Sequence, residues 1–139
     1  MFIAPSRTGK STQAELWRQY AGAEIINGDR ALVKKKDGVW HSFGYPCCGS
    51  SDICMNRTLP LEAIVVLEQG TENKIEKISY AKKIRALVTG TELFRWNQGE
   101  IENAFKLAEE LAAEIPIIKL VCLPNEDAVE SLQKYLEEQ

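Results

Sequence analysis

The sequence predicts an α/β domain in which helices flank a β-sheet. Two apolar residues at the start, Phe2 and Ile3, stop at Ala-Pro, and good helix formers follow over residues 10–20. Further along, short β-branched segments alternate with segments of helical periodicity. A chain of 139 residues has room for one core, so we expect a single domain over residues 1–139.

The first helix is expected at residues 10–20, with Gly22 as its end. Its predicted buried face consists of residues three or four positions apart: Ala14, Trp17, Tyr20 and Ala21. Residues 24–27 contain Ile25 and Ile26 and predict a short strand. Residues 31–35 and 39–43 flank Asp37-Gly38, a dipeptide that favours the turn of a β-hairpin.

The remaining elements alternate in type. We expect a buried strand at 61–67, mixed strand and helix at 77–88, a helix at 100–115, a strand at 117–123 and a final helix at 126–138. The helix at 100–115 presents an apolar face of Ile101, Ala104, Phe105, Ala108, Leu111 and Ala112. Residues 44–58 are rich in Gly, Pro, Ser, Cys and Asn, which predicts a long functional loop.

The residues with the clearest chemistry lie between the first strand and the first helix. Residues 4–12 fit the phosphate-loop pattern GxxxxGK[ST], except that Ala4 replaces the first glycine. Such a loop surrounds phosphates with backbone N–H groups, here those of Ser6, Arg7, Thr8, Gly9, Lys10, Ser11 and Thr12. The Lys10 ammonium is expected to contact the β- and γ-phosphates and the Ser11 hydroxyl to contact Mg²⁺. If position 4 needs a positive φ, Ala4 is strained there.

Phosphoryl transfer also needs an acidic group near the metal. Asp29 follows Lys10 by enough chain for one helix and a returning strand, so we predict that it lies beside the loop as a catalytic and metal-binding residue. The alternative is that Asn27-Gly28-Asp29 forms an ordinary surface turn.

The order of these segments resembles HPr kinase/phosphorylase-like and phosphoenolpyruvate carboxykinase-like ATP-binding domains. The similar segments are residues 6–12, 25–29, 44–50, Asn56, 60–61 and 63–69. More narrowly, the chain is similar to small bacterial members of that superfamily, which usually have no assigned substrate. The similarity covers most of residues 1–137.

The resemblance implies a P-loop domain with a mixed, bent β-sheet flanked by helices, and Mg-ATP bound at residues 6–12. It places Ser11 and Asp29 near the metal and the loop 44–57 near the phosphoryl acceptor. The implied acceptor-side residues are Cys48, Gly49, Ser50, Asn56 and Arg57. Arg57 is either a contact for the transferred phosphate or a solvated side chain at the start of a strand.

The chain departs from this family at several positions. Members with phosphotransfer activity often carry two adjacent aspartates where this chain has Gly28-Asp29, and Arg7 stands where glycine is common. Relatives also have strands upstream of the phosphate loop. One alternative is therefore that this domain lacks those upstream strands.

Net charge, apolar runs and cysteine content indicate which partners, compartment and thiol state to expect. A net charge of -3 does not favour nucleic acid. No apolar run is long enough for a membrane span and the start lacks a signal-peptide pattern, so we expect a cytoplasmic protein without a membrane partner. Cytosolic reductants would then keep all four cysteines as thiols: Cys47, Cys48, Cys54 and Cys122.

Two functions follow from the residues and the resemblance. The first is a kinase that transfers the γ-phosphate of ATP to a hydroxyl of a small molecule or peptide, with Lys10 and Asp29 as catalytic residues. The second is a nucleotide-binding accessory or switch protein with little turnover, which acts with a partner enzyme or assembles as a homo-oligomer. The single carboxylate at Gly28-Asp29 favours the second. A small-molecule kinase of the parallel-sheet type ranks last, because it would need an arginine-rich lid.

Overall fold

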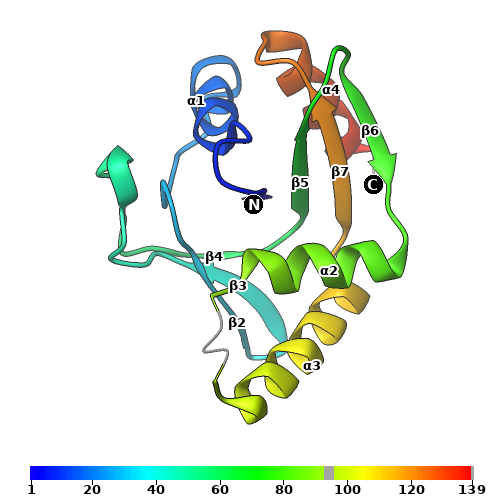
Figure 1. Cartoon of the computed structure of the whole chain (residues 1–139). Coiled ribbons are helices and arrows are strands. Elements are labelled where there is room, and N and C mark those ends of the chain that lie inside the picture. The colour runs from blue at the N-terminus through cyan, green and yellow to red at the C-terminus, as the bar shows by residue number, and fades with distance from the viewer. Residues whose placement is uncertain (93–95, 139) are drawn as a thin grey trace.

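The computed structural model describes residues 1–92 and 96–138 and contains a mixed β-sheet at its centre (Figure 1). The strands of this sheet are β1 (Phe2–Ile3), β5 (Ile64–Gln69), β7 (Ile117–Cys122) and β6 (Lys74–Lys77), in that spatial order. The first three are parallel, and β6 is antiparallel to β7. β5 and β7 are central, and the central position of β5 agrees with the buried strand expected at 61–67.

Four helices flank the described sheets. They are α1 (Lys10–Ala21), α2 (Tyr80–Gly90), α3 (Gln98–Glu114) and α4 (Glu126–Glu137). The side chains of Asn97 and Asn125 cap α3 and α4 by accepting hydrogen bonds from the N–H groups of Glu100 and Ala128. α1 contacts α4 and α2 contacts α3. In the described residues no helix is both long and apolar enough to cross a membrane.

A second, antiparallel sheet contains β2 (Leu32–Lys36), β3 (Val39–Phe43) and β4 (Thr58–Pro60). β2 and β3 form the predicted hairpin, and its turn places Asp37 at φ 52° and Gly38 at φ 81°. Figure 1 shows α2 and α3 beside this sheet. The sequence-based expectation of an α/β fold with a mixed sheet flanked by helices is confirmed, but the hairpin lies in a separate sheet.

The two faces of the central sheet have separate cores. Ile64 of β5 and Ile117 of β7 pack with Trp40 and with residues of α2 and α3. Val65 and Leu67 of β5 face the other way and pack with residues of α1 and α4. The alternation follows from the two-residue period of a strand, so β5 is buried on both sides.

Tertiary contacts overrule some of the predicted local details. Residues 24–27 do not join the central sheet; only Asn27 makes an isolated bridge, to Cys54. On α1, Tyr20 is exposed and Gln13 is buried instead, while Phe105 is exposed on α3. The strand expected at 61–67 begins at Ile64, because the preceding residues belong to or follow β4.

Candidate functional site

The predicted phosphate loop connects the end of β1 with the start of α1. Gly9 is the residue preceding α1 and has a φ of 99°, in the left-handed region. Arg7, two positions earlier, also has a positive φ, of 65°. Left-handed residues of this kind occur in turns whose backbone N–H groups bind anions. In this loop the N–H of Thr8 donates to the carbonyl of Pro5, at 3.4 Å. Ser6, Thr8, Ser11 and Thr12 lie along this loop and the first turn of the helix.

Lys10 reaches back across the loop. Its ammonium group donates hydrogen bonds to the carbonyl oxygens of Ala4, at 2.8 Å, and Pro5, at 3.2 Å. The positive charge is thereby held beside the backbone N–H groups that precede α1. An anion in the loop would meet both the Lys10 charge and the positive end of the helix dipole.

Ala4 does not carry the strain considered from the sequence. Among the described non-glycine residues, those with positive φ are Arg7, Asp37 and Asp52, and Ala4 is not one of them. The position that favours glycine is Arg7, where a side chain in the left-handed region costs roughly 1 kcal/mol. Alanine at position 4 therefore adds no strain to the loop backbone, whereas arginine at position 7 does.

Asp29 lies on a segment that pairs with the long loop. The N–H of Gly28 donates to the carbonyl of Ile53 at 3.0 Å, and the N–H of Met55 donates to the carbonyl of Ile26 at 2.9 Å. The returning strand expected beside the phosphate loop thus pairs with residues 53–55 instead. Asp29, Lys10 and Ser11 are among the many residues that line one cleft of about 2260 Å³, but the ion pair of Asp29 is with Arg30 and not with Lys10.

The carboxylate of Asp29 has a charged neighbour in the guanidinium of Arg30, at 3.8 Å. Arg30 also forms an ion pair with Glu92 after the end of α2, at 2.8 Å. The Asp29 side chain is about half exposed, at 52%. It is therefore accessible to a ligand in the cleft.

The loop at residues 44–57 contains a disulfide bond between Cys48 and Cys54. This corrects the sequence-based prediction that all four cysteines are thiols; Cys47 and Cys122 are free. The turn Gly49–Ser51, with Gly49 at φ 60°, reverses the chain and brings the Cα atoms of Cys48 and Cys54 to 5.1 Å. Ser50 lies in this turn.

The candidate acceptor residues do not form one cluster. Gly49 lies against Asp29, since a Cβ placed on Gly49 would be 2.8 Å from the Cβ of Asp29. Arg57, the candidate contact for the transferred phosphate, forms an ion pair with Glu24 and is half exposed. Asn56 is exposed. The structure therefore places Cys48, Gly49 and Asp29 in neighbouring segments and engages Arg57 elsewhere.

Sequence reasoning gave Asn27 no role, yet its side chain holds the long loop in place. The Asn27 amide group donates to the carbonyls of Tyr45, at 3.0 Å, and Arg30, and its oxygen accepts from the N–H of Tyr45 at 3.1 Å. The signal was its position next to Gly28-Asp29, but its partner Tyr45 is 18 residues away. Asn27 joins the start of the loop to the segment that carries Asp29.

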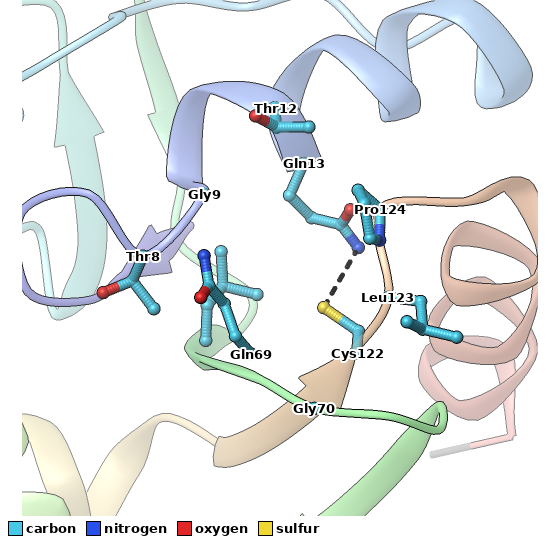
Figure 2. Close-up of a pocket in the computed structure, with 10 residues that line it drawn as sticks. Thr8, Gly9, Thr12, Gln13, Gln69, Gly70, Cys122, Leu123 and Pro124 are labelled. Carbon is cyan, nitrogen blue, oxygen red and sulfur yellow. Dashed lines mark hydrogen bonds between the residues drawn. The ribbon is translucent and has the colours of Figure 1, made fainter.

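A smaller pocket of about 360 Å³ adjoins the phosphate loop (Figure 2). Residues of the loop and of α1 line one side of it: Thr8, Gly9, Thr12 and Gln13. The ends of β5 and β7 and the residues after them line the other: Leu67, Gln69, Gly70, Cys122, Leu123 and Pro124. Ligands of α/β proteins bind preferentially at the carboxyl ends of parallel strands, which is where this pocket lies.

Comparison with protein-family models, with curated proteins and with solved structures finds no match for this chain.

The residues present fit Mg-ATP. The loop before α1 and the Lys10 ammonium suit phosphates, and the Ser11 hydroxyl and the Asp29 carboxylate are each an oxygen ligand of the type that Mg²⁺ prefers. Within residues 1–92 and 96–138, no group of three or more His, Cys, Asp or Glu side chains could hold a metal ion. Mg²⁺ bound with a nucleotide needs no such group, because phosphates and water supply most of its ligands.

Proposed function

We propose that this chain is an ATP-dependent phosphotransferase that acts on a hydroxyl of a small molecule or a peptide. The supporting observation is the loop before α1, in which Arg7 and Gly9 have left-handed backbones and Lys10 spans the loop to Ala4. This arrangement has the parts needed to hold a chain of phosphates. The resemblance to HPr kinase-like and phosphoenolpyruvate carboxykinase-like P-loop domains supports the same function.

Each candidate residue has a separate task in this proposal. The backbone N–H groups of residues 6–12 bind the phosphates, and Lys10 stabilises the negative charge on the β- and γ-phosphates. Ser11 and Asp29 would hold Mg²⁺, which neutralises phosphate charge when it is bound. The cleft that contains Asp29 receives the acceptor, with Cys48 and Gly49 in the neighbouring loop.

The transfer step conserves all atoms. The acceptor oxygen forms a bond with the γ-phosphorus as the bond from that phosphorus to the β–γ bridging oxygen breaks. The bridging oxygen keeps the electron pair and leaves as part of ADP. In this proposal Asp29 accepts the hydroxyl proton, because its carboxylate is half exposed in the cleft that Lys10 and Ser11 also line.

One observation favours the accessory or switch function. A Cβ at Gly28 would lie 1.7 Å from the Oγ of Ser51, so the second aspartate of active family members does not fit at this position unless Ser51 moves. The Ser51 hydroxyl is itself held by a hydrogen bond to the carbonyl of Cys48, at 2.8 Å. A protein limited to the Asp29 carboxylate could bind nucleotide for a partner enzyme and turn it over slowly.

Transfer of label from γ-labelled ATP separates the two functions. The acceptors are a pool of small hydroxyl-containing metabolites and a pool of peptides, and the proteins are wild type, Asp29→Asn and Asp37→Asn. Asp37 lies in the β2–β3 turn, so its variant is a matched control for loss of one carboxylate. The kinase predicts a labelled product with wild type and Asp37→Asn that falls at least tenfold with Asp29→Asn, while nucleotide affinity changes much less. Tight ATP binding without product from either pool supports the accessory function instead.

A further inference from the structure

The pocket beside the phosphate loop contains a buried polar group that the proposed phosphate site does not use. Gln13, in the first turns of α1, is only 3% exposed. Figure 2 shows its side chain extending from α1 toward Cys122 across the pocket. Its Nε2 donates to the Cys122 sulfur at 3.9 Å.

This contact uses little of the hydrogen-bonding capacity of Gln13. A carboxamide offers two N–H donors and an oxygen acceptor, and a thiol sulfur is a weak acceptor. Burial of such a group is costly unless it has good partners. With Nε2 directed at the sulfur, the oxygen Oε1 is the group left to accept a hydrogen bond from a ligand in the pocket.

The rest of the pocket suits a flat, partly apolar ligand joined to phosphates. Its volume of about 360 Å³ lies in the range of small-molecule sites. Leu67, Leu123 and Pro124 supply apolar walls, and the exposed Gln69 adds a second carboxamide. Thr8, Gly9 and Thr12 line the pocket as well as the phosphate loop, so one ligand can occupy both places.

We propose that this pocket receives the adenine base of the bound nucleotide and that Gln13 recognises its exocyclic amino group. The proposal rests on the nucleotide binding of the proposed function. The adenine N6 amino group donates to the Gln13 oxygen, and the apolar walls cover the ring. Hypoxanthine, the base of inosine, has a carbonyl oxygen at this position, which places one acceptor against another and is disfavoured.

The first test compares ATP, inosine triphosphate and inorganic tripolyphosphate by calorimetry. Wild type should bind ATP about tenfold more tightly than inosine triphosphate, and Gln13→Leu should lose that preference without a change in tripolyphosphate affinity. Gln133→Leu is the matched control, because Gln133 is on α4 and bonds to Glu137 outside this pocket. Unchanged tripolyphosphate binding also shows that the Gln13 variant is folded.

The second test needs no substitution. Cys122 lines the pocket, so ATP should slow its alkylation severalfold at mildly alkaline pH, while tripolyphosphate should not. Cys47, a free cysteine outside the pocket, is the internal reference, and mass spectrometry of peptides distinguishes the two sites.

The outcomes separate this proposal from the proposed function. If wild type binds ATP and inosine triphosphate equally, or if Gln13→Leu keeps the preference, the base lies elsewhere and the proposal is overturned. Equal protection of Cys122 by ATP and tripolyphosphate overturns it too. If tripolyphosphate still binds in these cases and Lys10→Ala weakens that binding, the phosphate site of the proposed function is supported. If neither ATP nor tripolyphosphate binds, both proposals are overturned.

Discussion

The ammonium group of Lys10 and the carbonyl oxygen of Ala4 are joined by a hydrogen bond of 2.8 Å across the loop that precedes α1. The bond connects the first residue of the helix with the residue that follows β1. It holds the cation at the loop, and a bound phosphate would replace the neutral carbonyl acceptor with an anionic one, which makes the pair stronger.

Replacement of Lys10 by alanine should therefore weaken Mg-ATP binding by about 2 kcal/mol, close to thirtyfold in affinity. The lost interaction is a partly desolvated pair of opposite charges. Isothermal calorimetry measures it, and Lys82→Ala on the exposed face of α2 controls for loss of one positive charge. Equal nucleotide affinity in wild type and Lys10→Ala would contradict a phosphate site at this loop.

Arg7→Gly should raise the free energy of unfolding by roughly 0.5 kcal/mol. The left-handed backbone at φ 65° costs an arginine about 1 kcal/mol, and part of the gain is lost because glycine is more flexible in the unfolded chain. Arg7→Ala is the control, since it removes the same exposed side chain but keeps the Cβ. Urea denaturation should show the gain only for glycine; a gain of equal size for alanine would assign it to the side chain.

The Cys48–Cys54 bond should leave two titratable thiols in the purified protein without reductant. Alkylation before and after reduction, followed by mass spectrometry, should label Cys47 and Cys122 first and all four cysteines afterwards. Burial raises the pKa of the Cys122 thiol, so Cys122 should react slowly near neutral pH and faster after unfolding. Four thiols in the unreduced protein would exclude the bond.

The contacts of Glu114 should make stability fall in acid. The ammonium of Lys35, at 2.6 Å, and the Trp40 indole N–H, at 2.9 Å, hold the pKa of Glu114 below its ordinary value of 4.5. The unfolded chain therefore takes up this proton first as pH falls, so the contribution of Glu114 is present above pH 4.5 and is lost as pH drops through the lower folded pKa. Urea denaturation across this range should show a shallower loss for Glu114→Gln than for Glu109→Gln on the same helix; equal slopes would exclude the contribution.

Local sequence patterns were enough to predict most helices, the hairpin and a loop directly before α1. The turn at Asp37-Gly38 forms because both residues accept a positive φ, and α3 and α4 follow from their apolar periodicity. The glycine and lysine of residues 9–10 place the loop directly before α1. These features depend on interactions within a few residues, which a sequence displays directly. Nucleotide binding by this loop stays a prediction.

The tertiary structure decided which distant segments meet. It pairs Asn27 with Cys54 instead of with the central sheet, joins Cys48 to Cys54, and sets Asp29 against Gly49. It also buries Gln13 of α1 and turns its side chain toward Cys122, 109 positions away. Helical periodicity had instead predicted that Tyr20 is buried, and Tyr20 is exposed. Such contacts are selected by the packing of whole elements and by the pairing of buried polar groups across the fold, and neither is encoded in the spacing of neighbouring residues.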